Sequence, residues 1–235
     1  MKTSAVIVAA GASTRMGSGM SKQLIPLCGR TLIGHTLAAF DRCPYVSEII
    51  LVARKCDLPA ISTVAKEAVA DKPLKIMAGG DTREQSVLNG INACDPAAEL
   101  LCIHDGARAL VTAEMLERVM LAAGEAGAAA LAVPVKDTVK RCAADGFILD
   151  TPRRSELWLA QTPQVFRREL YLRALESHAR HPVPVTDDCR LLELAGIPVK
   201  LVMGGYDNIK VTTPEDVLIA QALLEARSQR QDARA

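Results

Sequence analysis

The residues best suited to chemistry lie in a loop that follows the first apolar run of the chain. This loop, residues 9–23, reads AAGASTRMGSGMSKQ and combines small residues with two cations, Arg15 and Lys22. Small residues let backbone N–H groups approach an anion closely, and the two side chains add fixed positive charge. The pattern therefore predicts a phosphate-rich ligand, and a nucleotide is the ligand that we expect.

The loop differs from three common phosphate-binding or catalytic loops. It lacks G-x-x-x-x-G-K-[ST], G-x-G-x-x-G directly after the strand, and G-x-S-x-G. These are the signatures of P-loop nucleotide hydrolases, dinucleotide-dependent dehydrogenases and α/β-hydrolases. On composition alone, the same residues could also form a flexible surface loop without a ligand.

The elements that must position this loop follow from the alternation of short apolar runs with longer amphipathic stretches. Continuous hydrophobicity predicts strands that are buried on both faces. The order predicts an α/β fold with a doubly wound, mostly parallel, Rossmann-like sheet, in which ligands bind beyond the carboxyl ends of the strands. The last helix is marked by Thr213 as N-cap and Pro214 at its first position. The predicted strands are 4–9, 48–52, 75–78, 100–103, 130–134 and 199–203; the predicted helices are 31–41, 58–70, 82–93, 113–123, 167–178, 187–194 and the segment after Thr213.

One segment, residues 137–150, breaks this rhythm. Two β-prone stretches flank Asp145-Gly146, a pair typical of tight hairpin turns. We expect an inserted β-hairpin arm over residues 137–155, within a single domain of residues 1–235. Such an arm would cover the site or reach a second subunit; the alternative is a surface excursion without function.

The composition argues against several classes of protein. Lys and Arg number 28 against 27 Asp and Glu, and aromatic residues make up 3%, so neither a basic footprint nor a stacking platform for nucleic acid is expected. No apolar run approaches the roughly 20 residues needed to span a bilayer. The seven cysteines are odd in number and contain no C-x-x-C pair, which indicates a reducing compartment. We expect a cytoplasmic protein with no nucleic-acid or membrane partner.

Six later motifs, in order along the chain, make the sequence resemble the 2-C-methyl-D-erythritol 4-phosphate cytidylyltransferase family of sugar-phosphate nucleotidylyltransferases. Together with the first loop they cover nearly the whole chain. Where the family commonly has Ala and Pro, this chain has Gly106 and Ala109. The motifs are GGDTREQSV at 79–87, HDGAR at 104–108, VKDTVK at 135–140, AQTPQVF at 160–166, VTDD at 185–188 and DNIKVT at 207–212.

The resemblance implies an activity. The family transfers CMP from CTP to a polyol phosphate, 2-C-methyl-D-erythritol 4-phosphate, giving 4-diphosphocytidyl-2-C-methyl-D-erythritol and pyrophosphate in non-mevalonate isoprenoid biosynthesis. It also implies Mg²⁺ as cofactor and a homodimer formed through the 137–155 arm. The alternatives are a ribitol-5-phosphate cytidylyltransferase and, in another class, a non-catalytic nucleotide-sensing protein.

The same resemblance implies roles for individual residues, and Asp105 is also the expected Mg²⁺ ligand, directly or through water. Arg154 would be donated by the neighbouring subunit, with Arg153 as its adjacent rival. The implied catalytic residues are Arg15, Lys22 and Lys210; the nucleotide-binding residues are Ala9, Ala10, Gly11, Gly80, Asp81, Arg83, Ser86, Asp105 and Gly106; the acceptor-binding residues are Arg108, Thr138, Arg154, Thr162, Thr186 and Lys210.

Three of these residues have simpler structural explanations. Asp81 could be the N-cap of the next helix, with Glu84 closing a capping box. Asp105 could stabilise a turn before Gly106. Lys210 could be a solvated lysine at a strand end.

Overall fold

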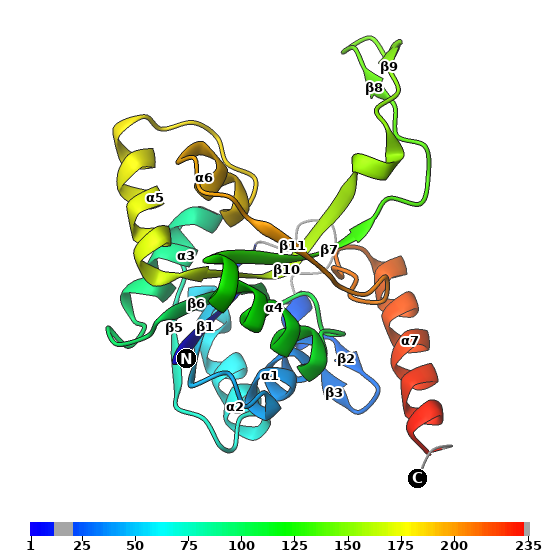
Figure 1. Cartoon of the computed structure of the whole chain (residues 1–235). Helices are drawn as coiled ribbons and strands as arrows, with labels where there is room; N and C mark the ends of the chain where they lie inside the picture. The colour runs from blue at the N-terminus through cyan, green and yellow to red at the C-terminus, as the bar shows by residue number, and fades with distance from the viewer. Residues whose placement is uncertain (12–20, 233–235) are drawn as a thin grey trace.

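A seven-stranded sheet forms the centre of the computed structural model, which describes residues 1–11 and 21–232, with side chains to residue 230. The strand order is β11-β7-β10-β6-β1-β4-β5. All neighbouring pairs are parallel except those of β10, which runs antiparallel to both β6 and β7 (Figure 1). This arrangement confirms the predicted doubly wound, mostly parallel sheet. The strands are β1 Thr3–Ala9, β4 Glu48–Ala53, β5 Leu74–Ala78, β6 Leu100–Asp105, β7 Ala128–Pro134, β10 Trp158–Arg167 and β11 Lys200–Met203.

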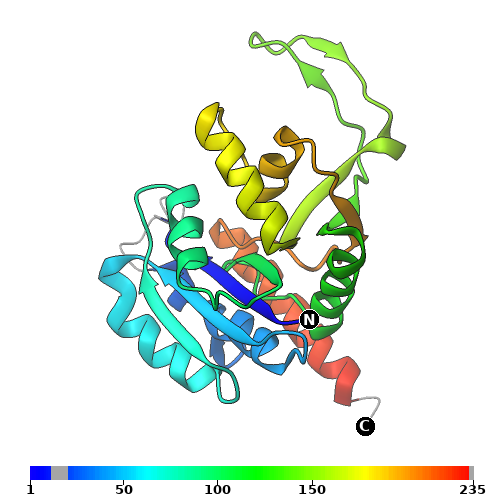
Figure 2. The same ribbon diagram turned by 60° about the vertical axis from the view of Figure 1, so that its left-hand side comes forward.

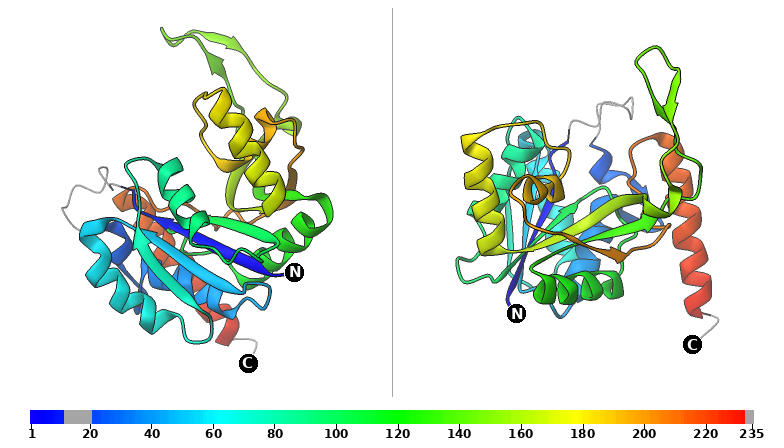
Figure 3. Two further views of the ribbon diagram at one scale, coloured as in Figure 1. Left: turned by 90° about the vertical axis from the view of Figure 1, so that its left-hand side faces the viewer. Right: turned by 45° about the horizontal axis from the view of Figure 1, so that its top comes forward.

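Helices cover both faces of this sheet (Figures 2 and 3). Because side chains alternate along a strand, Ala5 and Ile7 of β1 join the core beneath α1, α2 and α4, whereas Val6 joins the core beneath α3, α5 and α6. The helix α7 packs on a smaller cluster around Leu27 and Val211. The helices are α1 Leu32–Arg42, α2 Leu58–Ala68, α3 Arg83–Asn92, α4 Ala113–Ala126, α5 Arg168–Arg180, α6 Asp188–Leu194 and α7 Pro214–Asp232, with short 3-10 helices η2 Lys22–Leu24, η3 Lys55–Asp57 and η4 Arg154–Glu156.

The start of α7 matches its prediction. Thr213 Oγ1 accepts a hydrogen bond from the Asp216 backbone N–H at 3.4 Å, and Asp216 Oδ2 accepts from the backbone N–H groups of Thr212 and Thr213 at 2.8 and 2.9 Å. This reciprocal cap satisfies N–H groups that a helix N-terminus leaves free. It also fixes the direction in which the preceding residues enter the helix.

Two sequence expectations about the sheet are wrong. The edge strands β5 and β11 contain no fully buried residue, and Leu201 and Met203 of β11 are 44% and 51% exposed. An edge strand has a neighbour on one side alone, so its apolar run does not imply burial on both faces. The sequence pattern also failed to predict β10, whose polar residues and Pro163 interrupt its hydrophobicity.

The predicted hairpin is present and extends away from the sheet (Figure 1). Its strands are β8 Arg141–Cys142 and β9 Ile148–Asp150, and Gly146 adopts a φ of +90° in the turn, a conformation that favours glycine. The tip carries three exposed apolar side chains: Phe147, Ile148 and Leu149. A second short hairpin pairs β2 Pro26–Leu27 with β3 Arg30–Thr31. In the described residues, no helix is both long and apolar enough to cross a membrane.

Candidate active site

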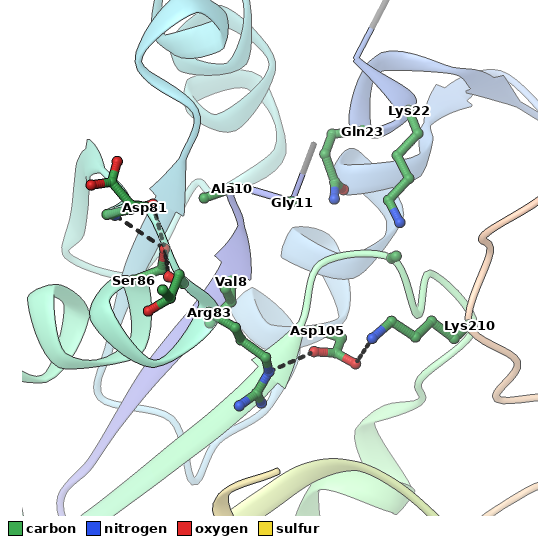
Figure 4. Close-up of a pocket in the computed structure, with 13 residues that line it drawn as sticks. Val8, Ala10, Gly11, Lys22, Gln23, Asp81, Arg83, Ser86, Asp105 and Lys210 are labelled. Carbon is green, nitrogen blue, oxygen red and sulfur yellow. Dashed lines mark hydrogen bonds and ion pairs between the residues drawn. The ribbon is translucent and has the colours of Figure 1, made fainter. Parts of the chain in front are cut away.

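A cavity of about 250 Å³ lies where β1, β5 and β6 end, the place where a doubly wound sheet binds its ligands (Figure 4). Its wall combines the end of β1, the start of η2, the junction between β5 and α3, and the last residue of β6. Lys210 closes the wall from the segment between β11 and α7. The lining residues are Val8, Ala10, Gly11, Lys22, Gln23, Gly80, Asp81, Thr82, Arg83, Ser86, Asp105, Ala107 and Lys210.

Asp105 is the electrostatic centre of the cavity. Its carboxylate pairs with Lys210 Nζ at 2.8 Å, and Arg83 Nε lies at 3.8 Å (Figure 4). Arg108 Nε lies at 3.9 Å from the same carboxylate. Burial alone would raise the pKa of Asp105, but these three cations outweigh burial and hold the pKa below its ordinary value. Asp105 is therefore an anion at neutral pH, and a turn-stabilising role alone does not describe its contacts.

Arg83 is held by a second carboxylate. Its Nη2 donates to Asp188 Oδ2 at 2.7 Å, and Asp188 Oδ1 accepts from the Tyr171 hydroxyl at 2.7 Å. Gln164 of β10 completes the arrangement, because its Oε1 accepts from the Asp188 backbone N–H at 3.0 Å. Burial lowers the pKa of Arg83, but Asp188 and Asp105 more than offset this, so the guanidinium stays charged beside the cavity.

The junction between β5 and α3 is shaped by Ser86. Its Oγ donates to the Thr82 carbonyl at 2.9 Å and accepts from the Gly80 N–H at 3.1 Å. The N-cap of α3 is Thr82, whose side chain accepts from the Gln85 N–H at 3.0 Å. The alternative in which Asp81 caps this helix with Glu84 is therefore wrong, and the exposed Asp81 stands at the rim of the cavity.

The first loop contributes Lys22 and Gln23 through the short helix η2. Lys22 Nζ donates to the Val211 carbonyl at 3.3 Å, so it lies against the segment that carries Lys210. Gln23 is 2% exposed, and its Oε1 has no hydrogen-bond partner in the described part of the chain. A buried acceptor without a partner costs free energy, so an N–H donor of a ligand or a water molecule would stabilise it.

The predicted site residues that the structure describes fall into three groups. Nine line the cavity: Ala10, Gly11, Lys22, Gly80, Asp81, Arg83, Ser86, Asp105 and Lys210. Four lie buried or half-buried behind it: Ala9, Gly106, Arg108 and Thr162, the last of which accepts the Asp105 N–H at 3.0 Å. Thr138, Arg154 and Thr186 are exposed and do not contribute to this cavity in the described chain, and Arg15 lies outside the described residues.

Several contributors were not predicted from the sequence. Gln23 and Asp188 stood in recognised motifs, yet nothing in their spacing indicated which side chains point to the site. Tyr171 lies in the first turn of α5, outside the recognised motifs, and gave no signal. His104 is fully buried beside Asp105, with Nδ1 at 3.1 Å from Thr162 Oγ1. Burial lowers the pKa of His104 to about 3, so this imidazole is neutral at physiological pH.

The carboxylates of the cavity suit a metal ion bound jointly by the protein, substrate phosphates and water better than an ion enclosed by protein ligands alone. Within residues 1–11 and 21–232, no three His, Cys, Asp or Glu side chains form a group that could hold a metal ion. Asp105 and Asp81 are the acidic groups among the described lining residues. Mg²⁺ commonly binds through one or two carboxylates together with substrate phosphates and water, which this donor set fits.

Comparison with known proteins agrees with this architecture. The sequence profile of the 2-C-methyl-D-erythritol 4-phosphate cytidylyltransferase family (IspD) matches residues 3–226. The enzyme of that name from Desulforamulus reducens is 44% identical, over 95% of this chain and 96% of that protein. The enzyme of that name from Caldanaerobacter subterraneus is also 44% identical, over 95% of this chain and 99% of that protein.

Solved structures give the same result. The 4-diphosphocytidyl-2C-methyl-D-erythritol synthase from Anaerococcus prevotii is similar with a TM-score of 0.86 and 35% identity, over 95% of this chain and 96% of that one. The 2-C-methyl-D-erythritol 4-phosphate cytidylyltransferase from Thermus thermophilus follows with a TM-score of 0.76 and 30% identity, over 95% and 98%. The motifs predicted this relationship, and the chain belongs to the 2-C-methyl-D-erythritol 4-phosphate cytidylyltransferase family.

Proposed function

We propose that this protein transfers CMP from CTP to 2-C-methyl-D-erythritol 4-phosphate, releasing pyrophosphate, as the names of its relatives describe. The observation that carries the proposal is the cavity beyond β1 and β6, where Lys22, Arg83 and Lys210 all line the wall and the last two pair with Asp105. Three cations in one small cavity suit a ligand with several phosphates.

The chemistry follows from charge. An oxygen of the acceptor phosphate attacks the α-phosphorus of CTP, the bond between the α-phosphorus and its bridging oxygen breaks, and pyrophosphate leaves with that electron pair. The nucleophile is already anionic near neutral pH, so no strong general base is needed. Repulsion between the acceptor phosphate and the triphosphate is the main obstacle, and we assign its neutralisation to Lys22, Lys210 and Arg15. Lys210 can serve both phosphates, because its ammonium group is half-exposed at the cavity wall.

Mg²⁺ is the proposed cofactor, and Asp105 is the residue that would hold it, directly or through water. When bound, the ion neutralises phosphate charge and favours the transition state. The donor set described above supports this assignment, because one buried carboxylate faces the cavity and leaves the remaining ligands to phosphates and water. Lys22, Lys210 and Arg15 would neutralise charge on the same phosphates.

The acceptor side of the site is proposed to include a second subunit. Thr138 and Arg154 belong to the 137–155 arm, whose tip exposes Phe147, Ile148 and Leu149. Exposed apolar groups on a projecting hairpin support a homodimer contact, through which Arg154 would reach the partner's acceptor. Arg154 Nη1 donates to the Lys136 carbonyl at 2.9 Å, whereas Arg153 Nη1 lies at 3.7 Å from Glu156 Oε1. A cytoplasmic location is part of the same proposal and suits the seven unpaired cysteines.

The test is Mg²⁺-dependent release of pyrophosphate from CTP. We expect release with 2-C-methyl-D-erythritol 4-phosphate, and little without an acceptor. Ribitol 5-phosphate in a parallel reaction distinguishes the nearest alternative, because preference for it would change the substrate assignment. No release with either polyol phosphate, while CTP still binds in calorimetry, would favour the nucleotide-sensing alternative.

A further inference from the structure

Lys210 lies in a segment without helix or strand, residues 204–213, between β11 and α7. A lysine side chain is long and flexible, so the position of its ammonium group depends on how this backbone is fixed. Several bonds hold the segment, including Arg227 on Asp207 and the Ala107 carbonyl on the Val211 N–H at 2.9 Å. Asn208, two residues before Lys210, is bonded to β10 in the interior of the sheet.

Two amide side chains form that connection. Asn208 is fully buried, and its Nδ2 donates to Gln161 Oε1 at 3.2 Å and to the Thr162 carbonyl at 3.1 Å. Gln161 is 6% exposed, and its Nε2 donates to the Gly205 carbonyl at 2.8 Å. A Cβ at Gly204 would overlap Gln161 Oε1, so the backbone approaches this amide as closely as glycine allows. The Lys210 segment is thereby bound to β10 at three points.

The neighbour of Gln161 in β10, Thr162, contacts the other member of the ion pair. The pairing of β10 with β7 shifts register between Ala160 and Gln164, and Gln161 and Thr162 lie within this irregularity. Thr162 Oγ1 accepts the Asp105 N–H at 3.0 Å, while Gln161 holds the Lys210 segment. One irregular segment of β10 therefore contacts both the backbone of Asp105 and the segment that carries Lys210, whose charged groups are 2.8 Å apart.

Arg108 reinforces the arrangement from the opposite side. Its Nη1 donates to the Asn208 carbonyl at 2.7 Å, and its Nε lies at 3.9 Å from Asp105 Oδ2. Asn208 is thus held through both its side chain and its backbone, at a position two residues before Lys210. Its Oδ1, in contrast, has no partner in the described part of the chain.

We propose that Asn208 and Gln161 are positioning residues that hold Lys210 against Asp105, and so against the phosphates of the two substrates. This inference rests on the proposed cytidylyltransferase function. Neither side chain lines the cavity, so both act through Lys210. A displacement of about 1 Å in a reacting group can cost about 100-fold in rate.

A double-mutant cycle tests the proposal. Asn208→Ala alone should lower kcat by about 10- to 100-fold, because Lys210 loses its fixed position. In a Lys210→Met background, the same substitution should lower kcat by less than about twofold, because the residue on which it acts is gone. Gln161→Met, which keeps the volume but removes both hydrogen bonds, is the second variant should Asn208→Ala fail to fold. Ser4→Ala is the control, because it removes a buried hydrogen bond to Glu48 at the opposite end of β1.

A second measurement does not depend on turnover. Acetylation of Lys210 by an N-hydroxysuccinimide ester, followed by peptide mass spectrometry, should become severalfold faster in Asn208→Ala, with Lys200 of β11 as an unchanged internal reference. If wild-type protein shows no CMP transfer, the proposed function fails while this labelling still tests the positioning. Equal losses of kcat with and without Lys210, or an unchanged acetylation rate at Lys210, would overturn the proposal.

Discussion

Replacing Lys210 with Met should remove most turnover while leaving the fold intact. The substitution keeps a side chain of similar length and deletes the ammonium group that lies 2.8 Å from Asp105 Oδ2. If that group stabilises charge on the phosphates in the transition state, its loss should lower kcat by about 10²–10³, the effect of removing one charge-stabilising donor from an active site.

The structure predicts a much smaller effect on stability. Lys210 is 42% exposed, and Asp105 keeps Arg83 and Arg108 within 4 Å after the substitution. Partly exposed ion pairs contribute about 0–1 kcal/mol, so the free energy of unfolding should fall by about 1 kcal/mol. For a chain of this size, that loss corresponds to a Tm lower by about 2–4 °C.

The assay is the initial rate of pyrophosphate release at saturating CTP and acceptor, paired with a thermal denaturation curve. Lys200→Met is the matched control, because Lys200 is an exposed lysine of β11 whose nearest acid, Glu125, lies at 4.0 Å. Its kcat and Tm should match those of the wild type. A Lys210→Met enzyme with kcat within about twofold of wild type would refute the electrostatic role. A large loss of Tm would instead make Lys210 a structural residue.

Three further outcomes follow from the structure. Tyr171→Phe removes the hydroxyl that orients Asp188 against Arg83. In urea unfolding, it should lower the free energy of unfolding by about 1.5–3 kcal/mol. In steady-state kinetics, it should raise the KM for CTP more than it lowers kcat. Burial lowers the pKa of His104 from 6.5 to about 3, so between these pH values the unfolded state binds a proton that the folded state does not. The free energy of unfolding should therefore fall by up to about 1.4 kcal/mol per pH unit as the pH drops through this window. In urea titrations, His104→Gln should make this dependence on pH less steep. Replacing residues 139–150 by a short glycine linker should leave the fold of the single chain intact in far-UV circular dichroism, because none of them is buried in the chain, while light scattering should show loss of the proposed dimer. An unchanged mass would refute the arm's role.

The parts of the fold that could be predicted are those encoded locally. Strands 4–9 and 100–103 are continuous apolar runs, and Thr213, Pro214 and Asp216 mark the start of α7 through neighbouring residues alone. The hairpin at Asp145-Gly146 is of the same kind, because its turn requires a positive φ at the glycine. In each case, the determining residues lie within a few positions of the structure that they determine.

The site was harder to predict, because its contacts join distant segments. Motif resemblance identified Asp105, Arg83 and Lys210, and the structure brings all three together. It gave no information on Asp188, which holds Arg83 across 105 residues of sequence, because that pairing depends on how α6 packs beside α3. The strand β10 escaped prediction for a related reason: its irregular, polar centre serves the ion pair rather than the hydrophobic core.

The chain has 28 basic and 27 acidic residues, and a similar balance of charge is found at the cavity. Among the described residues that line the cavity, Lys210 is paired with Asp105, and Arg83 is paired with Asp188 and Asp105. A polycationic site without such partners would repel itself and destabilise the fold. Asp188 is buried, does not line the cavity and accepts from the Tyr171 hydroxyl, so its pairing with Arg83 does not compete with a bound ligand. Asp105 and the half-exposed Lys210 both line the cavity, so their ion pair lies where phosphates would bind. The structure therefore neutralises Arg83 from within the protein and leaves the fixed ammonium group of Lys210 to act on the ligand.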